Sequence, residues 1–323
     1  MTSQSDATRL ALIKQLADGA FHSGEHLSEL LGISRAAISK HCRALAELGV
    51  EIFSVKGKGY RLAQPLQLLE LSEMRRYLPA MYDFPIEIVN IIDSTNDYIK
   101  QADKRSNGMA VLAEAQTAGR GRQGRRWVSP FGASIYLSMC WQFSQGYEAI
   151  SGLSLAVGVA LIDALQASGI QGAQVKWPND IYLDGKKVAG ILVEVEGQMG
   201  GQCECVIGIG VNINLRSEQP DIDQPWTDLR AHADADINRN QIAVNLLNAL
   251  TRILQEFEQH GLTNLQSQWQ QHDIFYGRTV NLISGSQVIT GTAKGIDHRG
   301  GLLLEVDGEV KTYFGGEISV RPA

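Results

Sequence analysis

A glycine- and arginine-rich segment at residues 116–127 carries the strongest chemical signal in the sequence. Within it, four arginines alternate with glycines and no acidic side chain intervenes: Arg120, Arg122, Arg125 and Arg126, with Gly119, Gly121 and Gly124. Glycines let a backbone approach a ligand closely, and guanidinium groups offer paired donors to phosphate or carboxylate oxygens. The segment therefore favours an anionic small molecule activated at phosphorus, with a solvated basic loop or a nucleic-acid contact as alternatives.

The same glycines match the spacing of the dinucleotide-binding fingerprint, G-x-G-x-x-G. That fingerprint opens a hydrophobic helix, and an acidic residue follows about twenty residues later. Here the residues that follow are aromatic or turn-forming (Trp127, Pro130, Phe131 and Gly132). The context argues against a dinucleotide site.

A second candidate region spans residues 176–194. The segment Lys176-Trp-Pro-Asn-Asp180 leads into two apolar runs separated by Asp184-Gly185, a pair typical of tight β-hairpins. Alternation along the return strand places Lys187 on the face that carries Ala189, Ile191 and Val193. A lysine in that register extends to solvent or points into a pocket, where its charge suits a phosphate or carboxylate.

Two further segments present polar or small side chains. Asp93-Ser-Thr-Asn96 follows an apolar run that ends at Ile92, where it can cap a helix or bind a polar ligand, and capping is favoured for the segment taken alone. Alternation over residues 206–215 puts Gly208, Gly210, Asn212 and Asn214 on one face. Such a face leaves room for a flat ligand against a sheet, or its glycines mark bulges.

The first 65 residues predict a winged helix-turn-helix. Apolar spacing indicates a helix that stops at Gly19, and Ser23 and Ser34 are expected to cap two more, separated by a turn at Gly32. The outer face of the third helix carries Arg35, Ala36, Ser39, Lys40 and Arg43, and a hairpin with Lys56 and Lys58 at its tip follows. DNA binding is favoured over a three-helix module that binds another protein.

The remaining elements divide the chain into three predicted domains, 1–65, 66–273 and 274–323. A strand over 85–92 should feed the helix after Asp93, and helices capped near Asn238 fill residues 238–272. From Tyr276 onward short alternating strands are separated by turns at Gly285-Ser286, 299–301 and Asp307-Gly308, which indicates a small β-barrel.

Composition places the protein in the ordinary globular class. The chain has 323 residues, with 29 basic and 35 acidic side chains and a net charge of -6, which taken whole argues weakly against a nucleic-acid or membrane partner. Residues 1–65, however, hold eight basic and six acidic side chains, or +2, which leaves -8 on the rest. Four cysteines are expected to be structural thiols. No secretory signal or membrane span is expected, and the cytoplasm is the predicted compartment.

Four motifs occur in an order that resembles the bifunctional biotin–protein ligases and biotin-operon repressors: Asp93–Asn96, Gly119–Trp127, Lys176–Asp180 and Lys187–Glu194. The resemblance covers nearly the whole chain, and the helix-turn-helix marks the repressor class. It implies an α+β multidomain fold, with a winged helix-turn-helix, a central mixed α/β ligase domain similar to class II aminoacyl-tRNA synthetases, and a C-terminal SH3-like β-barrel.

The resemblance also implies a two-step ligase. Biotin and ATP with Mg²⁺ would give biotinyl-5′-AMP, and the biotinyl group would pass to a lysine of a biotin carboxyl carrier protein, the acetyl-CoA carboxylase subunit. The adenylate would also act as corepressor, so that an adenylate-bound homodimer binds operator DNA. No membrane partner is implied.

Residue roles follow from the matching motifs. Biotin binding is implied for Ser94, Thr95, Asn96, Gln116, Arg120, Gly121, Arg122 and Lys187, and binding of ATP or adenylate for Arg120, Arg122, Trp127, Lys176, Asn179, Asp180, Asn212 and Trp226. Arg122 and Lys187 would be catalytic, and the magnesium ligands are not assigned. DNA contacts are expected from Ser23, Ser34, Arg35, Ala36, Ser39, Lys40, Arg43, Lys56 and Lys58. Gly315-Gly-Glu317 resembles the terminal turn of the family.

Two other functions compete with this interpretation. One is a ligand-sensing repressor without ligase activity, against which the set Arg120, Arg122 and Lys187 speaks. The other is a lipoate or octanoate ligase of related fold. The combination of Lys176-Trp-Pro-Asn-Asp180 with the glycine- and arginine-rich segment (the arginine loop, residues 116–127) favours biotin over lipoate or octanoate.

Overall fold

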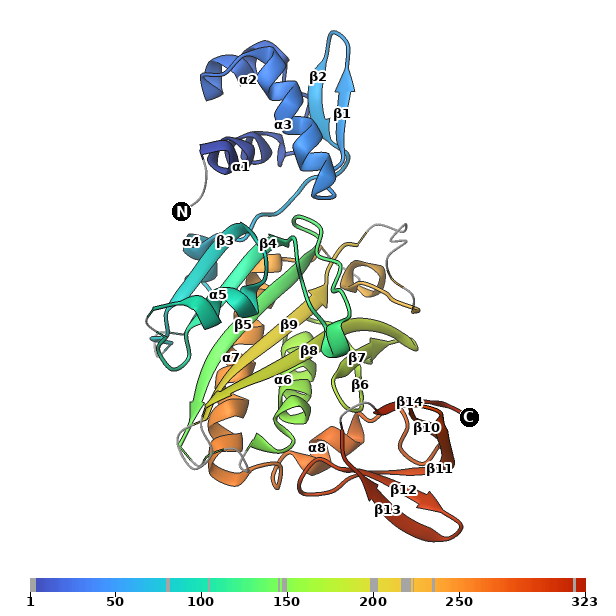
Figure 1. Ribbon diagram of the computed structural model, residues 1–323. Helices are drawn as coiled ribbons and strands as arrows, with labels where there is room; N and C mark the ends of the chain where they lie inside the picture. Colours follow the sequence, from blue (N-terminus) through green and yellow to red (C-terminus); the bar gives the residue numbers. More distant parts are fainter. Residues whose placement is uncertain are drawn as a thin grey trace.

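The computed structural model describes residues 4–79, 82–103, 105–144, 146, 150–197, 203–215, 222, 224–233, 236–315 and 318–323. Three β-sheets, of two, seven and five strands, follow one another along the chain. Figure 1 shows the small helical unit at the N-terminus, the large sheet in the middle and the short C-terminal strands at the opposite end.

The N-terminal unit is a winged helix-turn-helix, as predicted. It comprises α1 (Gln4–Leu16), α2 (Gly24–Leu31), α3 (Arg35–Glu47) and the hairpin β1 (Ile52–Val55) and β2 (Gly59–Leu62). Ser23 Oγ accepts from the His26 N–H at 3.0 Å, and Ser34 Oγ from the Ala37 N–H at 3.2 Å. Both predicted caps are confirmed, and Gly32 takes the left-handed conformation between the helices, with φ of 64°.

The central sheet has the strand order β3-β4-β5-β9-β8-β7-β6. Its strands are β3 (Ile86–Ile92), β4 (Ala110–Gln116), β5 (Ser134–Phe143), β6 (Gln174–Lys176), β7 (Asp180–Leu183), β8 (Lys186–Gly197) and β9 (Cys203–Asn212). Only β3 and β4 run parallel among these described neighbours. A mixed sheet of this kind accommodates hairpins at one end and a helical crossover at the other.

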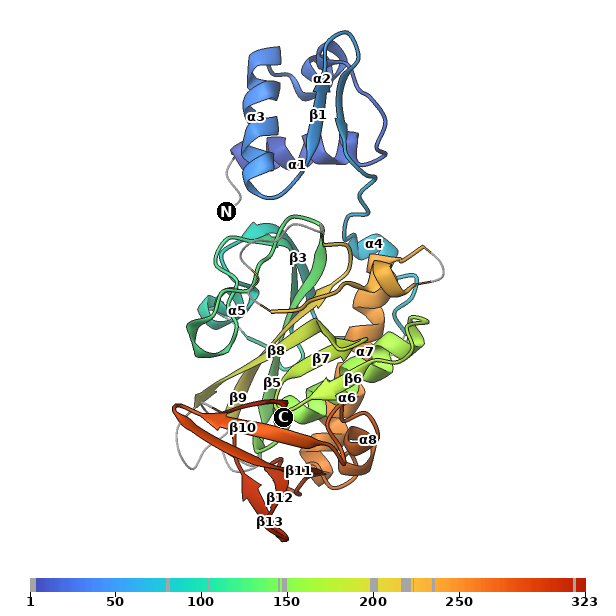
Figure 2. The same ribbon diagram turned by 90° about the vertical axis from the view of Figure 1, so that its right-hand side faces the viewer.

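Helices cover both faces of this sheet. α6 (Leu153–Ala167) and α7 (Arg239–His260) pack against each other and against one face, with α8 (Gln266–Gln271) beside them (Figure 2). α5 (Thr95–Gln101) packs on the other face, where Ile99 meets Val111, Cys140 and Val206. α6 is buried nearly all round, which explains its unbroken apolar sequence. Within the described residues, no helix is both long and apolar enough to cross a bilayer.

A buried ion pair fixes the segment that joins the N-terminal winged helix-turn-helix (the head, residues 4–62) to the central sheet. Glu114 on β4 and Arg239 on α7 contact each other at 2.9 Å. The Leu69 N–H donates to Glu114, and Arg239 Nη1 donates to the Gln67 carbonyl. The short α4 (Leu71–Met74) follows. Because a buried charge is tolerated only when paired and hydrogen-bonded, these contacts fix the connector to the sheet.

The C-terminal strands form one antiparallel sheet in the order β13-β12-β11-β10-β14. They are β10 (Thr279–Ser284), β11 (Gln287–Ile296), β12 (Leu302–Val306), β13 (Glu309–Tyr313) and β14 (Ile318–Pro322). The predicted turns at Gly285-Ser286 and Asp307-Gly308 join these strands. Of the predicted terminal turn Gly315-Gly-Glu317, residues 316 and 317 lie outside the described residues.

Candidate active site

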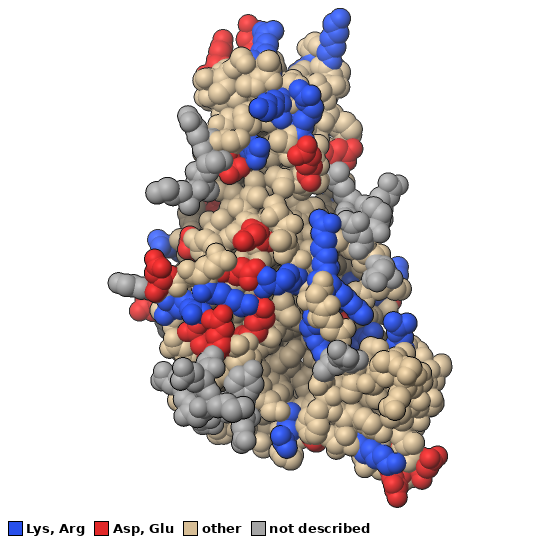
Figure 3. All heavy atoms as spheres, in the orientation of Figure 1, with Lys and Arg blue, Asp and Glu red and all other residues tan. Residues whose placement is uncertain are grey.

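A pocket of about 850 Å³ lies between the middle of the central sheet, the arginine loop and the C-terminal strands. It is lined by every residue for which the sequence predicted a small-molecule contact: Ser94, Thr95, Asn96, Gln116, Arg120, Gly121, Arg122, Trp127, Lys176, Asn179, Asp180, Lys187, Asn212 and Trp226. Figure 3 shows Lys and Arg side chains around the hollowed middle of this face. Four segments far apart in sequence thus meet at one place.

The strand-to-helix junction after β3 both caps a helix and lines the pocket. Ser94 Oγ accepts from the Asp97 N–H and so caps α5. The next two side chains are buried among polar partners: Thr95 donates to Gln116 Oε1 at 3.1 Å, and Asn96 donates to Glu194 Oε2 at 2.7 Å. The junction is thus compatible with both uses that the sequence left open, because Ser94 caps the helix and all three side chains line the pocket.

Two serines that the sequence analysis missed hold the residues that line this end of the pocket. Ser138 Oγ on β5 donates to Asn96 Oδ1 at 2.5 Å and lies 2.7 Å from Thr95 Oγ1. Ser129 accepts from Gln116 Nε2 at 3.0 Å. Ser138 lies in an apolar strand directly opposite Gly208. A small polar residue among apolar neighbours was the only signal, and it is uninformative until that pairing is known.

The glycines of β9 line the pocket, in agreement with the expectation that they leave room beside the sheet, and they also make room for the protein's own side chains. A Cβ at Gly210 would lie 2.4 Å from Trp127 Cε2, and one at Gly208 would lie 2.4 Å from Asn96 Oδ1. Such distances are far inside van der Waals contact. Gly208 and Gly210 are therefore needed because the Asn96 amide and the Trp127 indole lie close against β9. The pairing of β9 with β8 is regular, so neither glycine forms a bulge.

Lys187 reaches the pocket by way of a β-bulge, and its predicted face was wrong. In the β7–β8 hairpin Ile181 pairs with Ala189, whereas Tyr182 pairs with Lys187, so one extra residue, Val188, is accommodated on β8. The bulge resets the alternation, and Lys187 shares the pocket face with Gly190 instead of the core face with Ala189 and Ile191. Its ammonium lies 2.7 Å from Asp180 Oδ1 and 5.3 Å from the Trp127 ring centroid.

Two further cations flank Lys187. Lys176 Nζ donates to the Tyr182 hydroxyl at 3.0 Å, and burial lowers its pKa, against the opposing charge of Asp180. Arg122 Nη1 donates to Asn179 Oδ1 at 3.1 Å, and burial lowers its pKa as well. Asp180 is the single carboxylate among the described residues that line the pocket. Partly desolvated cations that outnumber acids attract an anion strongly.

The segment around Trp226 runs beside Lys187. The Lys187 N–H donates to the Pro225 carbonyl and the Thr227 N–H donates to the Lys187 carbonyl, at 3.1 and 2.9 Å. Asn212 Nδ2 donates to the Thr227 carbonyl at 3.0 Å. Trp226 is half-buried at the pocket wall. Residues 216–221 and 223, which precede this segment, lie outside the described residues.

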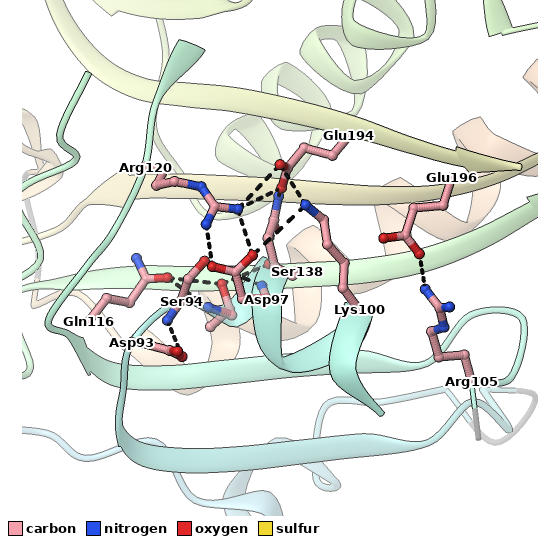
Figure 4. A network of polar contacts seen from close by, with 12 residues as sticks. Asp93, Ser94, Asp97, Lys100, Arg105, Gln116, Arg120, Ser138, Glu194 and Glu196 are labelled. Carbon is pink, nitrogen blue, oxygen red and sulfur yellow. Dashed lines mark hydrogen bonds and ion pairs between the residues drawn. The ribbon is translucent and has the colours of Figure 1, made fainter. Parts of the chain in front are cut away.

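Arg120 lies at the pocket rim with its guanidinium turned to acidic side chains. Its Nη2 contacts Asp97 Oδ1 at 2.7 Å and both oxygens of Glu194 at 3.2 Å (Figure 4). The hydrogen bond to Asp97 is the main cause of a raised pKa of Arg120. Arg120 and Arg122 therefore stand in different surroundings, although the sequence treated them alike.

The C-terminal strands contribute side chains that the sequence did not predict. Arg278, Ile283 and Arg321 line the pocket, and the Trp177 indole donates to the Gly300 carbonyl at 3.0 Å. No spacing within the sequence connects these residues to the motifs of the central sheet, so only the packing of the two units reveals them.

The predicted DNA-contact residues divide into two groups. The hydroxyls of Ser23 and Ser34 are used as helix caps. The basic side chains are exposed on α3 and at the tip of the β1–β2 hairpin (Arg35, Lys40, Arg43, Lys56 and Lys58), with Ala36 exposed and Ser39 half-buried beside them. The exposed basic side chains thus lie on α3, the second helix of the helix-turn-helix, and at the tip of the wing.

Comparison with known proteins agrees with this architecture. Family models for an HTH domain, the Biotin/lipoate A/B protein ligase family and the Biotin protein ligase C terminal domain match residues 8–61, 88–214 and 275–321. The bifunctional ligase/repressor BirA of Salmonella typhimurium is 46% identical over 97% of this chain and 98% of its own. The biotin–[acetyl-CoA-carboxylase] ligase of Mycobacterium tuberculosis is 34% identical over 72% of this chain and 88% of its own.

A solved structure extends the agreement to three dimensions. The biotin protein ligase of Aquifex aeolicus in complex with biotin and ATP covers 74% of this chain and 99% of its own, with 28% identity and a TM-score of 0.65. The full-length relative, in contrast, covers 97% of this chain, of which residues 8–61 match the HTH domain model. The chain belongs to the family of bifunctional biotin–protein ligases and repressors.

Proposed function

We propose that this chain activates biotin with ATP and transfers it to a lysine of a biotin carboxyl carrier protein of acetyl-CoA carboxylase. In the first step a carboxylate oxygen of biotin attacks the α-phosphorus, the bond to the leaving pyrophosphate breaks, and biotinyl-5′-AMP remains. In the second step the neutral lysine amine attacks the acyl carbon, AMP leaves, and the amine loses its proton. The carrying observation is that Lys187, Arg122 and Lys176 line one pocket with the polar cluster around Thr95 and Asn96.

The polar cluster suits the ureido ring of biotin. The ring offers two N–H donors and one carbonyl acceptor, and it needs partners that are buried and fixed in place. Ser94, Thr95, Asn96 and Gln116 supply hydroxyl and amide groups. The Ser94 hydroxyl is held by the Asp97 N–H, and the other three side chains by Ser138, Ser129 and Glu194. Held groups lose little entropy on binding, which favours affinity. We assign the ring to this end of the pocket.

The cations suit the reacting end. A carboxylate that attacks a phosphate brings two anions together, and positioned cations offset their repulsion and stabilise the charge that develops at phosphorus. We assign this role to Arg122 and Lys187. Arg120 and Gly121 lie in the same arginine loop, which would cover the ligand. The adenylate would contact Trp127, Lys176, Asn179, Asp180, Asn212 and Trp226, all of which line the pocket.

Magnesium would be held mainly by the phosphates of ATP. Among the described residues no three His, Cys, Asp or Glu side chains converge, and the pocket carboxylate Asp180 is the one protein ligand on offer. This donor set fits an ion that keeps most of its water and substrate oxygens. Bound there, it would neutralise phosphate charge, while Asp180 also orients Lys187.

The head extends the proposal to transcription. The exposed basic side chains of α3 and the wing would contact operator DNA, and an adenylate-bound homodimer would pair two heads on a symmetric site. The domain limits 1–65, 66–273 and 274–323 belong to this proposal. Sedimentation with and without biotin and ATP tests the homodimer, and binding to the promoter of the biotin operon, compared between the full chain and residues 66–323, tests the head.

Pyrophosphate exchange into ATP tests the first step. With Mg²⁺, biotin should support exchange and lipoate or octanoate should not. Exchange with lipoate alone would favour the related lipoate ligases, which share the family model that matches residues 88–214. Binding of biotin without exchange would favour a ligand-sensing repressor.

A further inference from the structure

Glu194 on β8 forms the centre of a polar network beside the pocket. Its carboxylate accepts from Asn96 Nδ2 at 2.7 Å, lies 2.6 Å from Lys100 Nζ, and contacts Arg120 Nη2 at 3.2 Å (Figure 4). Burial alone would raise its pKa, but hydrogen bonds from Lys100 and Asn96 outweigh that effect and lower it. The group is therefore an ionised acceptor with three donors, two from α5 and one from the arginine loop.

One contact of Glu194 orients Asn96. An ionised carboxylate can only accept hydrogen bonds, so Asn96 must present its NH₂ to Glu194 and its carbonyl to Ser138, which donates at 2.5 Å. Gly208 leaves no space on the third side, because a Cβ there would lie 2.4 Å from Asn96 Oδ1. The amide has a single orientation, and the carboxylate decides which one.

The other contacts hold the arginine loop. Arg120 is bound by Asp97 on α5 and by Glu194 on β8, so the loop is tied to two elements of the pocket wall (Figure 4). Lys100 completes a set of two cations and two carboxylates. These side chains are 22 to 37% exposed, so dissolved salt screens the attraction between their charges less than it would on an open surface.

We infer that Glu194 is a positioning residue that couples the ring-binding end of the pocket to the arginine loop, because one carboxylate orients Asn96 and anchors Arg120. This inference rests on the proposed function for the identity of the ligand. It predicts that loss of the carboxylate weakens biotin binding and loosens the loop together, whereas loss of Asp97 loosens the loop alone.

The strand offers a matched control. Glu196 lies two residues further along the same face of β8 and pairs with Arg105, outside the pocket lining. Glu196→Gln removes the same charge from the same strand without touching Asn96 or Arg120. Asp97→Asn removes one anchor of Arg120 and leaves the Glu194–Asn96 contact in place.

Two measurements on the full chain separate these effects. The first is the Kd of biotin, by calorimetry, with the KM and kcat of biotin-dependent pyrophosphate exchange. The second, without substrate, is the rate of tryptic cleavage at the arginines of residues 120–126, assigned by mass spectrometry. Glu194→Gln should raise the Kd and KM of biotin about tenfold, the size of one lost charged hydrogen bond, and leave kcat within about twofold. The same variant should speed tryptic cleavage of the arginine loop several-fold. Asp97→Asn should speed cleavage only, and Glu196→Gln should change neither.

The inference is overturned if Glu194→Gln keeps the parental Kd or the parental cleavage rate, or if Glu196→Gln reproduces both changes. Glu194→Asp keeps the charge and shortens its reach by one methylene, so it should give the same changes at smaller size if the Gln variant does not fold. A parent chain that neither binds biotin nor supports exchange would refute the proposed function, while the cleavage rates, recorded without substrate, still decide the coupling of Glu194 to the loop.

Discussion

The ammonium of Lys187 lies 2.7 Å from the carboxylate of Asp180, across two strands whose register is shifted by a bulge. Without the bulge, Lys187 would face the core with Ala189 and Ile191. The Asp180 carboxylate holds the lysine at the pocket wall, where an incoming phosphate or carboxylate can contact the same ammonium. The pair therefore fixes the position of the charge before any ligand arrives.

Lys187→Ala should lower the rate of biotin-dependent exchange at least about tenfold, equivalent to about 1.4 kcal/mol of transition-state stabilisation. The reason is the loss of a positioned cation next to the reacting anions. Lys186→Ala is the matched control, because Lys186 is exposed on the same hairpin. An unchanged rate for Lys187→Ala would place this lysine outside the reacting site.

Gly210→Ala should disable the pocket by displacing Trp127. The added methyl would lie 2.4 Å from the indole, and overpacking of this kind costs about 1–3 kcal/mol. We expect weaker ATP binding and a lower melting temperature. Gly158→Ala on α6 is the control, since its Cβ would meet Val175 at 3.4 Å, close to ordinary contact. Normal ATP binding by Gly210→Ala would contradict this account of the glycine.

Phe131→Ala should loosen the head from the central sheet. The Phe131 N–H donates to the Leu48 carbonyl at 2.9 Å, and its ring is buried in the core of the head. Removal of a buried Phe side chain costs about 3–5 kcal/mol. Hydrogen–deuterium exchange over residues 5–62 should become faster, and operator binding should weaken, while biotin-dependent exchange persists. Unaltered protection of the head would show that Phe131 is not a principal contact.

Asp273→Asn should change the pH dependence of stability. Burial raises the pKa of Asp273 to about 6, from 3.8, against a hydrogen bond from the Phe275 N–H. The folded state holds the proton of Asp273 more tightly than the unfolded chain does, so the protonated carboxyl stabilises the folded state. This contribution to the free energy of unfolding is complete below pH 3.8 and is lost as the pH rises through about 6. The asparagine variant keeps the acceptor and has no charge to bury.

Urea unfolding of both proteins at about pH 5 and pH 8 measures this effect. The free energy of unfolding of the parent should fall relative to Asp273→Asn by about 1 kcal/mol between the two values. Parallel pH profiles for the two proteins would mean that Asp273 titrates as an ordinary surface carboxylate.

Local sequence predicted what depends on local physics. Ser23 and Ser34 were identifiable as caps because a cap acts within three residues, and Asp184-Gly185 because a tight hairpin turn needs residues that tolerate positive φ. The family resemblance carried by the four motifs implied the small-molecule contacts, and all of these residues line the pocket. The bulge at Val188 left no local signal, because the sequence of β8 alone predicts a regular alternation of its side chains between the two faces.

The missed features depend on contacts between distant segments. Gly208 and Gly210 could not be assigned to Asn96 and Trp127 until β9 was seen beneath both. Ser138 became informative only through its partners on α5. The same holds for Glu194, the last residue of the motif Lys187–Glu194, to which the sequence analysis assigned no role. Each gains its meaning from tertiary packing.

Transfer of biotin to a purified biotin carboxyl carrier domain tests the central claim most directly. The full chain, biotin, ATP and Mg²⁺ are incubated with the domain, and its mass and modified residue are determined by mass spectrometry, with a Lys187→Ala chain in parallel. The account predicts one biotinyl group on a single lysine, only when ATP is present, and slower transfer by the variant. A carrier domain that stays unmodified while the parent chain binds biotin and ATP would contradict it.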